Sequence, residues 1–277
     1  MGGAALDGLP DWVTLLRAPN PGPMTLDGTN TWVLRPPGEE YGVVIDPGPL
    51  DDGHLSRIAE HGPFSFILVT HGHHDHVEGA ARLSELLGGT AVLAADPAYC
   101  IAAEPLDPRE WLGSAGLEIR VLDTPGHTAD SVCFRIEHDG TAAMFTGDTI
   151  LGRGTTVVAP PDGDLEAYLN SLELLATYPD VPLLPGHGPA QPDAAAVARM
   201  YLDHRRERLA QVAAAMAAGA DTPEKVVDLV YPDIDPGVRF AAEWSAAAQL
   251  SYLRHRQNYP NHKNRESGTR SDGLDRL

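Results

Sequence analysis

The sequence predicts an α/β fold whose functional side chains lie at the ends of strands. Four apolar runs of strand length each lead into a glycine-containing loop that carries histidine or aspartate. After the first run, and again toward the end of the chain, apolar residues recur with helical spacing. Loops that follow strands in α/β proteins commonly carry functional groups, because the sheet holds their bases rigid. The four runs are Phe64–Val69, Ile119–Asp123, Ala142–Phe145 and Val181–Leu184.

The first run leads into the segment His71–His76, the most informative stretch of the chain. The run itself is β-branched and aromatic, which is typical of a buried strand. The segment brings three imidazoles and one carboxylate within reach of a common point, and His74 occupies a variable position that we leave out of the site. The apolar pattern that follows, ended by Gly88-Gly89, predicts a helix over His76–Leu87. We therefore expect Asp75 and His76 at the first turn of that helix.

The other three runs each supply one further candidate ligand. If the four strands share one sheet and one direction, all of these side chains meet at one rim. Imidazole and carboxylate without thiolate suit divalent zinc, or iron or manganese. Seven donors are too many for one tetrahedral ion, so we expect two ions about 3.5–4 Å apart with one bridging carboxylate. The seven are His71, His73, Asp75, His76, His127, Asp148 and His187.

The remaining histidines fall outside this pattern. A lone histidine is usually a surface or core residue, so we interpret these six as structural or surface groups. They are His54, His61, His138, His204, His255 and His262.

The combined motifs resemble those of the metallo-β-lactamase-fold hydrolase superfamily, over about residues 14–190. A narrower resemblance is to the group that contains β-lactamase-like protein 2 and glyoxalase II-like proteins, which includes a single-strand-directed endoribonuclease and thioesterases that act on polyketide carriers. It rests on the segments Gly28–Trp32, Thr124–Thr128, Gly147–Gly152, Gly154–Thr156, Tyr168–Leu172 and Tyr201–Arg205.

The resemblance implies a four-layer αββα sandwich with the metal ions at one edge. It implies that His71, His73 and His127 hold the first ion, that Asp75, His76 and His187 hold the second, and that Asp148 bridges them. Catalysis is then expected from Asp148 and from Asp75, which would orient the attacking water. Substrate contacts are expected from the residues Asn30, Thr31, Thr155 and Thr156, and from Arg153 in the loop after the bridging aspartate.

At two positions this sequence differs from related branches of the superfamily, and each difference makes one activity unexpected. Members that hydrolyse β-lactams commonly carry cysteine at the position of Asp148, so antibiotic hydrolysis is not the expected main activity. The diiron flavoprotein branch carries glutamate at the position of His73, so oxygen reduction is not expected either. We also expect Asp123, Thr128 and Thr149, which flank the ligands, to form hydrogen bonds with imidazole N–H groups.

The chain after the last ligand predicts three helices. Asp193 is a suitable N-cap for a helix that runs to Met216, with Gly219 as its stop. Further helices are expected from Asp221 to Val230 and over Gly237–Gln257. We therefore expect a catalytic domain over residues 1–192, a helical module over 193–257 and a disordered tail over 258–277. The resemblance makes the module winged-helix-like, although no strand pair for a wing is apparent.

The charge of the chain bears on its partners. The formal net charge is −19 over 277 residues, and residues 1–198 carry 8 basic and 28 acidic side chains, a balance of −20. Such a surface repels polyanions, which disfavours RNA as a partner and favours a small-molecule substrate. The best basic stripe is Arg199, Arg205, Arg206 and Arg208, but interleaved acids favour a solvated helix face.

The cellular location is expected to be the cytoplasm. No apolar run approaches the ~18 residues of a membrane span, and Met1–Asp7 has no basic start or long apolar stretch of a secretory signal. The two cysteines, Cys100 and Cys133, form no disulfide framework and are expected to be buried free thiols. The oligomeric state does not follow from the sequence.

Three functions remain open from the sequence. The first is a hydrolase that uses a hydroxide bridging two metal ions, most suitably Zn²⁺, on a small ester, thioester or related acyl substrate. The second is a single-strand-directed endoribonuclease of the same fold. The third is a mononuclear iron sulfur dioxygenase, which uses the same histidine and aspartate frame with one ion.

Overall fold

The central strands of this protein bury side chains on both faces, and this double burial builds the layers of the fold. The computed structural model describes residues 9–258. In β3 (Gly42–Ile45), Val43 and Ile45 pack between the two sheets, whereas Val44 packs against the helices outside. In β9 (Thr141–Gly147), Phe145 packs between the two sheets and Met144 packs against the helices outside. Because successive side chains of a strand point to opposite faces, strands covered on both sides are continuously apolar.

The strands form two mixed sheets of five. The first has the order β1 (Val13–Arg17), β2 (Asn30–Leu34), β3, β4 (Phe64–Leu68) and β5 (Ala91–Leu93). The second has the order β10 (Leu183–Pro185), β9, β8 (Val132–His138), β7 (Leu117–Asp123) and β6 (Trp111–Ser114). Strands β3, β4 and β5 run parallel, as do β9 and β10, and the other neighbours are antiparallel. The two sheets meet face to face, with the rings of Trp32 and Phe145 in edge contact at 5.9 Å.

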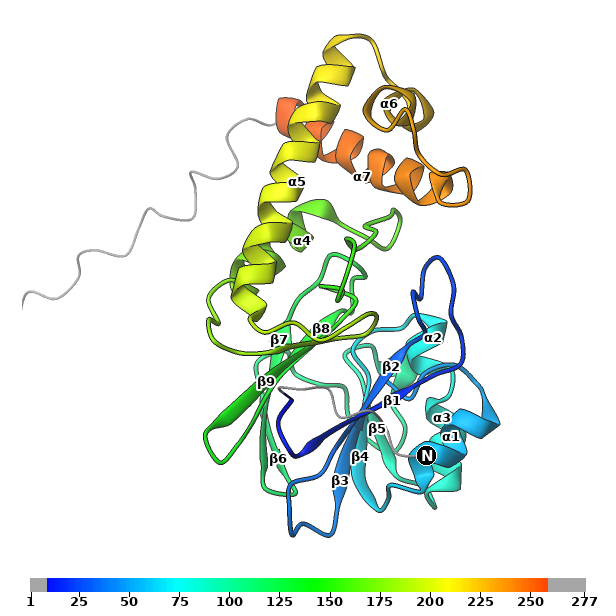
Figure 1. The fold of residues 1–277 in the computed structure, drawn as a ribbon, viewed down its shortest axis with the longest axis vertical. Coiled ribbons are helices and arrows are strands. Elements are labelled where there is room, and N and C mark those ends of the chain that lie inside the picture. The colour runs from blue at the N-terminus through cyan, green and yellow to red at the C-terminus, as the bar shows by residue number, and fades with distance from the viewer. Residues whose placement is uncertain (1–8, 259–277) are drawn as a thin grey trace, which may run out of the picture.

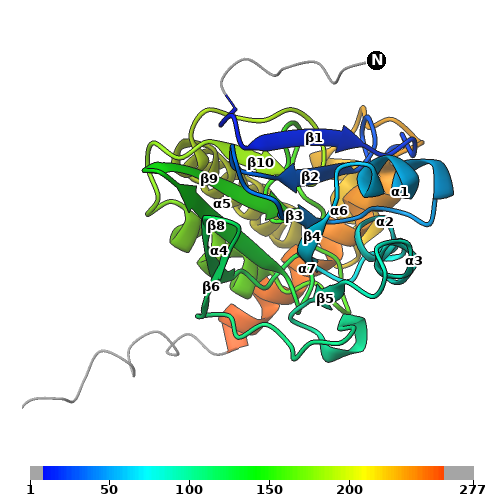
Figure 2. The same cartoon turned by 90° about the horizontal axis from the view of Figure 1, so that it is seen from below.

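Helices cover the outer face of each sheet, which gives the four layers visible in Figure 2. On the first sheet, α1 (Asp52–Ala59) and α3 (Ala80–Leu86) bury Leu55 and Leu83. On the second, α4 (Leu165–Leu175) and the first half of α5 (Ala194–Ala217) bury Leu172 and Ala198. This arrangement confirms the expected four-layer αββα sandwich.

The ligand-bearing strands do not share one sheet, and the assumption that they do is wrong. Strand β4, which leads into the first motif, belongs to the first sheet, while β7, β9 and β10 belong to the second. The donors nevertheless meet, because both sheets present the ends of these strands at the same edge of the sandwich, beside α2 (His74–Val77) (Figure 1).

The predicted single helix over His76–Leu87 is wrong in one respect, since it is divided into α2 and α3. The division falls at Gly79, whose N–H donates to the carbonyl oxygen of Gly48 at 2.9 Å. In the other direction, the N–H of Gly48 donates to the carbonyl oxygen of His76 at 3.1 Å. These two bonds to a neighbouring turn take the place of helix bonds. The expected position of Asp75 and His76 in a first helical turn is confirmed.

The C-terminal region is helical, as expected. Asp193 accepts hydrogen bonds from the N–H groups of Ala195 and Ala196 and so begins α5, which ends at Ala217 just before Gly219. Two further helices follow, α6 (Pro223–Val230) and α7 (Arg239–Asn258), and after β10 the described residues contain helices but no strand. Figure 1 shows α5 rising from the sandwich to α6 and α7. The division into domains at residue 192 stays a proposal. Helix α5 lies wholly after this boundary, yet its first half packs on the second sheet and its second half on α6 and α7.

Two expectations fall on the chain ends and lie outside the described residues. These are the absence of a signal over Met1–Asp7 and the tail from residue 258, of which only Asn258 is described, as the last residue of α7. Among residues 9–258, no helix is both long and apolar enough to span a membrane. Both cysteines are free thiols; Cys133 is buried as expected, but Cys100 is only half-buried.

Candidate metal centre

Four loops bring the seven candidate ligands together at the edge of the sandwich. They form two groups in which the donor atoms lie within 4.8 Å of one another. The first group is His71, His73, His127 and Asp148, and the second is Asp75, His76 and His187. Apart from Asp148, which the resemblance placed between the ions, these are the two sets of residues that the resemblance implied, and their role as ligands stays a prediction.

In the first group, the imidazole of His73 lies between two others. Its Nδ1 atom is 3.1 Å from Nε2 of His71 and 3.0 Å from Nε2 of His127. His71 and His127 are buried, whereas His73 is exposed. Three ring nitrogens this close, each with a lone pair to share, form a site suited to a cation.

In the second group, a carboxylate faces two buried imidazoles. The Oδ2 atom of Asp75 lies 3.0 Å from Nε2 of His187 and 3.5 Å from Nε2 of His76, and the two Nε2 atoms are 3.2 Å apart. Both imidazoles are fully buried, while the side chain of Asp75 is 27% exposed. Asp75 is therefore the member of this group that solvent can reach.

Asp148 joins the two groups. Its Oδ2 atom lies 3.8 Å from Nε2 of His127 and 3.4 Å from Nε2 of His187, and its Oδ1 atom lies 3.4 Å from Nε2 of His76. The Oδ1 atom is buried and has no hydrogen-bond partner among the described residues. A buried carboxylate oxygen without a donor is costly unless a cation compensates it. The donor chemistry and this atom together fit a bound divalent cation.

Each buried imidazole is held by its second nitrogen, which aims the first into the centre. The Nδ1 atom of His127 donates to the carbonyl oxygen of Val157 at 2.8 Å. The Nδ1 atom of His76 lies 2.7 Å from Oδ2 of Asp46. The remaining two contacts pair Nδ1 of His71 with Oγ1 of Thr70 at 3.0 Å and Nδ1 of His187 with the carbonyl oxygen of Gly28 at 3.3 Å. Such contacts fix the tautomer and orientation of a metal-binding imidazole.

The expected partners of the imidazoles were wrong. The hydroxyl of Thr128 contacts Asp130 and Ser131, and that of Thr149 contacts Thr124. Asp123 is exposed at the end of β7 and has no hydrogen bond to an imidazole among the described residues. Thr128 and Thr149 thus adjoin ligands in sequence but direct their hydroxyls to other groups, whereas Thr70, which adjoins His71, does contact an imidazole.

Asp46 is the functional residue that the sequence analysis missed. It is buried, and its carboxylate accepts from the backbone N–H and the hydroxyl of Thr70, at 2.8 Å each, as well as from His76. It thus ties the loop after β3 to the loop after β4. The signal was present, since the apolar run Gly42–Ile45 leads into Asp46 and Gly48 in the same way as the four recognised runs.

Gly186 allows the fourth loop to approach the centre. A Cβ atom at this position would lie 2.6 Å from Oδ1 of Asp148 and 2.6 Å from Cε1 of His76. Both distances are shorter than real Cβ contacts permit. Any side chain here would therefore push Asp148 or His76 out of place.

The expected substrate contacts fall into two sets, and their role stays a prediction. Asn30, Thr31 and Thr156 are buried, and their side chains donate to backbone carbonyl oxygens. Asn30 donates to Pro185 and Gly188, Thr31 to Asp46, and Thr156 to Asp148. Arg153 and Thr155 are exposed. The guanidinium of Arg153 forms a two-pronged ion pair with Asp27. Of the five residues, Arg153 and Thr155 are the ones that a ligand can reach from solvent.

Without metal, the histidines of the centre differ in protonation, because some have lowered and others raised pKa values. Burial lowers the pKa of His71 and of His127. Burial also opposes the protonation of His76 and His187, but nearby carboxylates, chiefly Asp148, outweigh it. The pKa of His76 is therefore raised well above its usual value, and that of His187 is raised to about 9. Although burial opposes it, His76 and His187 lower the pKa of Asp75 to about 2. Protons on two imidazoles therefore replace part of the missing positive charge.

We predict that the metal-free protein is most stable near pH 6.5, the ordinary pKa of histidine. Below it, the unfolded chain takes up protons at His71, His127 and His54, whose folded pKa values are lowered, so acid favours unfolding. Above it, the folded protein keeps protons on His76 and His187 that the unfolded chain releases. The His187 contribution, about 3 kcal/mol, is lost as the pH rises through about 9.

Urea unfolding of chelated protein, repeated from about pH 5 to about pH 9, measures this profile. The free energy of unfolding should pass through a maximum and fall on both sides. A value that rises steadily to pH 9 would contradict the assigned ion pairs.

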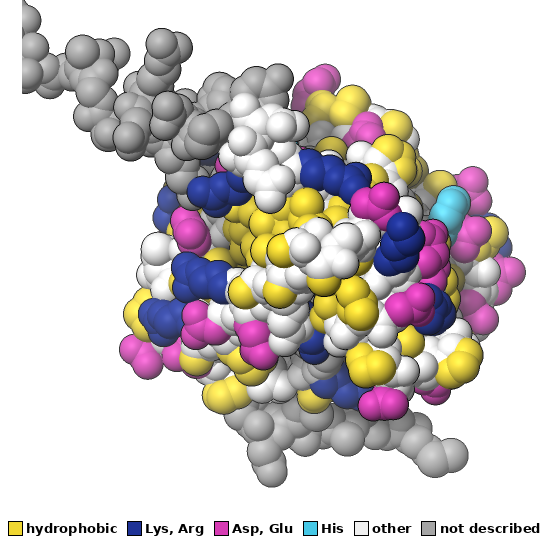
Figure 3. All heavy atoms as spheres, turned by 90° about the horizontal axis from the view of Figure 1, so that it is seen from above, with side chains coloured by type: hydrophobic (Ala, Val, Ile, Leu, Met, Phe, Trp, Pro, Cys, Tyr) yellow, Lys and Arg dark blue, Asp and Glu magenta, His cyan; other side chains and the backbone are white. Residues whose placement is uncertain are grey.

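The candidate basic residues of α5 do not line up as one exposed stripe, and the favoured interpretation, a solvated helix face, fails at Arg205. Arg205 is buried at 3% exposure, Arg206 pairs with Asp203, and Arg208 lies over the ring of Tyr231. On the face formed by the C-terminal helices, Figure 3 shows basic side chains scattered among hydrophobic and acidic ones.

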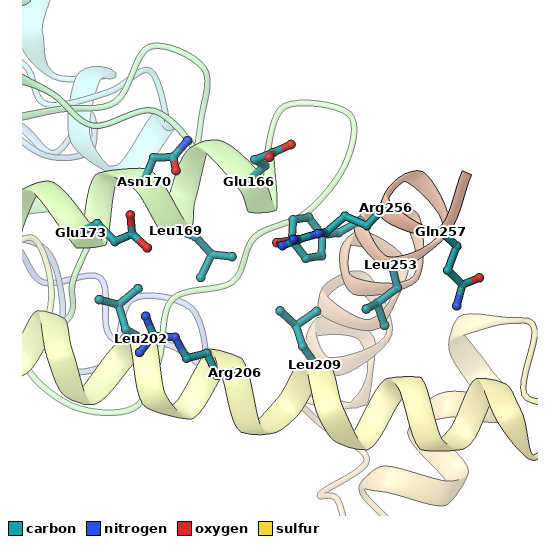
Figure 4. Close-up of a pocket in the computed structure, with 11 residues that line it drawn as sticks. Glu166, Leu169, Asn170, Glu173, Leu202, Arg206, Leu209, Leu253, Arg256 and Gln257 are labelled. Atoms are coloured by element: carbon teal, nitrogen blue, oxygen red, sulfur yellow. The ribbon is translucent and has the colours of Figure 1, made fainter. Parts of the chain in front are cut away.

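A separate cavity of about 520 Å³ lies between α4, α5 and α7 (Figure 4). Its lining includes Leu169, Leu202 and Leu253, with Arg206 and Arg256 among the charged side chains. None of the seven candidate ligands lines it. It is therefore distinct from the metal centre.

Comparisons with known proteins agree with this architecture. A model of the Metallo-beta-lactamase superfamily matches residues 24–187, a range that contains all seven donors. A Drosophila melanogaster protein named beta-lactamase-like protein 2 homolog is 31% identical over 263 residues, covering 84% of this chain and 85% of the relative. The atrochrysone carboxyl ACP thioesterase of Aspergillus fumigatus is 30% identical over 261 residues, covering 86% of this chain and 80% of the relative. A metallo-beta-lactamase family protein from Thermus thermophilus superposes with a TM-score of 0.72 at 24% identity, covering 89% of this chain and 94% of the other.

Proposed function

Because this chain belongs to the metallo-beta-lactamase superfamily, we propose that it is a hydrolase that uses two metal ions to cleave a small ester, thioester or related acyl substrate. The observation that carries the proposal is the pair of donor groups that share Asp148. The acyl substrate is supported by the relative named as an acyl-carrier thioesterase. Nitrogen and carboxylate donors without thiolate favour zinc, with iron or manganese as alternatives.

The protein's own groups prepare the centre for two ions. His71, His73 and His127 would hold the first, and Asp75, His76 and His187 the second, with Asp148 between them. When bound, such ions lower the pKa of a shared water and stabilise the developing oxyanion. The Val157 carbonyl keeps the proton of His127 on Nδ1, so that Nε2 presents its lone pair to the centre.

Asp75 is the residue that we propose to handle the proton of the nucleophile. Its Oδ2 atom faces His187 and His76, and its side chain is the more accessible of the two central carboxylates, at 27% against 11% for Asp148. A carboxylate with a lowered pKa stays ionised at neutral pH and can accept a hydrogen bond from water. Asp75 would thereby orient water for attack on an electrophilic carbonyl carbon.

The charge of the chain argues for a small substrate over RNA. The formal net charge is −19, and the arginines of α5 are buried or engaged in contacts within the protein. A protein that holds RNA by its phosphates needs accessible basic groups along a groove. We also propose a cytoplasmic location, for which the two free thiols are the support.

The proposal is tested by metal analysis together with a substrate panel. The purified protein is assayed for metal content and incubated with aryl esters, acyl thioesters, labelled single-stranded RNA and a persulfide under oxygen, each with and without chelator. We expect two ions per chain and chelator-sensitive release of acid from an ester or thioester. Cleavage of RNA alone would replace the acyl substrate with a nucleic acid. One iron per chain with oxygen uptake would replace the hydrolase with a dioxygenase.

A further inference from the structure

Arg205 is a buried cation that the proposed reaction does not use directly. It lies in the middle of α5 and is 3% exposed. No ion pair joins it to a carboxylate in the part of the chain that the structure describes, and its buried Nε atom has no hydrogen-bond partner there. A buried, unpaired charge is costly and is usually retained for a specific task.

The guanidinium group of Arg205 makes two contacts, both with segments that border the metal centre. One terminal nitrogen donates to the carbonyl oxygen of Thr156. Its central carbon lies 5.1 Å from the centre of the ring of Tyr168, on α4. A planar guanidinium can stack on a ring and donate to a carbonyl at the same time, which lysine cannot do with the same geometry.

The contact with Thr156 leads directly to two metal ligands. The hydroxyl of Thr156 donates to the carbonyl oxygen of Asp148 at 2.8 Å. The next residue, Val157, accepts from Nδ1 of His127 through its carbonyl oxygen at 2.8 Å. The peptide that Arg205 holds therefore fixes the backbone of the bridging carboxylate on one side and the orientation of an imidazole on the other.

The contact with Tyr168 reaches the same imidazole from the other side. A Cβ atom at Gly126, the residue before His127, would lie 2.3 Å from the backbone nitrogen and Cα of Tyr168. The backbone of α4 thus rests against the turn that carries His127. The hydroxyl of Tyr168 also donates to the carbonyl oxygen of Thr149 at 2.7 Å, next to Asp148.

A second residue of α5 holds the same loop one helical turn earlier. The hydroxyl oxygen of Tyr201 accepts from the N–H of Leu151 at 3.1 Å and lies 3.0 Å from the carbonyl oxygen of Gly154. Tyr201 and Arg205 are four residues apart and so share a face of the helix. Together they fasten the segment between Asp148 and Val157 to α5 at two points.

We propose that Arg205 is a positioning residue for the metal centre, through which α5 fixes the orientation of His127 and Asp148. This role extends the proposed function but concerns metal binding itself, which can be measured without a substrate. Loss of such a supporting contact typically weakens metal affinity by about 10–100-fold. The first half of α5 is then part of the catalytic unit.

The test compares zinc affinity of the metal-free full-length protein with that of Arg205→Met and Arg205→Lys. Arg206→Met is the matched control, because Arg206 is the next residue, is 62% exposed and forms a surface ion pair with Asp203. Zinc is titrated in competition with a chromophoric chelator, and the visible bands of Co²⁺-loaded protein report the ligand geometry. Circular dichroism verifies that each variant is folded.

We expect Arg205→Met to bind at least one zinc ion about 10–100-fold more weakly and to shift the Co²⁺ bands. Arg205→Lys should lie between this variant and the native protein, and Arg206→Met should match the native protein. A folded Arg205→Met with native zinc affinity and native Co²⁺ bands overturns the proposal, since Arg205 would then serve packing alone. If Arg205→Met does not fold, the same two readouts on Arg205→Lys decide. A failure of the acyl substrate would leave these readouts unchanged.

Discussion

Replacing Asp148 with alanine is expected to lower the rate of hydrolysis by at least about a thousandfold. Its two carboxylate oxygens lie 3.4–3.8 Å from three imidazoles of both donor groups, so that its loss removes the link between them. Metal ions contribute several kcal/mol of transition-state stabilisation, and about 1.4 kcal/mol corresponds to a factor of ten in rate. Turnover of the best substrate from the panel, under saturating metal, measures the effect.

The control for this variant is Asp203→Ala. Asp203 lies on α5, its side chain is 78% exposed, and it forms only a surface ion pair. Its activity should equal that of the native protein. Both variants should retain the native circular dichroism spectrum, because the two sheets are held by apolar contacts away from the centre. Full turnover in Asp148→Ala would remove Asp148 from the mechanism.

Removing the metal ions is expected to lower the melting temperature by more than about 10 °C. Each ion bound with free metal at about a thousand times its Kd contributes about 4 kcal/mol, and 1 kcal/mol corresponds to about 2–4 °C in a domain of this size. Without the ions, the cations that face the carboxylates of Asp46, Asp75 and Asp148 among the described residues are the imidazolium groups of His76 and His187.

Thermal melts with chelator, and again after zinc is restored, measure the effect of the ions on stability. The native melting temperature should return with zinc. The same cycle on Asp148→Ala should give a much smaller shift, because that variant holds the ions weakly. Identical melts of the native protein with and without chelator would mean that the ions do not stabilise the fold.

The strands that carry the ligands were predictable because their signals are local. Each of β4, β7 and β9 leads into a turn and has a local signal: β4 and β9 are largely apolar runs, and β7 alternates between buried apolar residues and exposed or half-buried polar ones. The cap of α5 at Asp193 and its stop before Gly219 were also visible, since caps depend on the few residues beside them.

The supporting residues of the centre were not predictable in the same way. Asp123 adjoins a turn that carries a ligand, yet it is exposed, whereas Asp46 precedes its partner His76 by 30 residues and meets it only in the folded chain. The basic residues of α5 show the same difficulty, because Arg205 and Arg206 are neighbours in sequence but one is buried and the other exposed. Helical phase separates them, and the packing of α5 on α4 decides which one is covered.

The sequence by itself determined the chemistry of the centre: its imidazoles and carboxylates, their place after strands, and the absence of thiolates among the seven donors. Only the tertiary structure decided that the donors come from two sheets. It alone also decided that Asp46 and Val157 hold imidazoles and that Arg205 holds the loop after Asp148. The physical reason is the separation along the chain over which each interaction acts. Strand, turn and cap preferences act over a few residues, whereas a hydrogen bond that orients a ligand joins segments whose separation along the chain is closed only by packing.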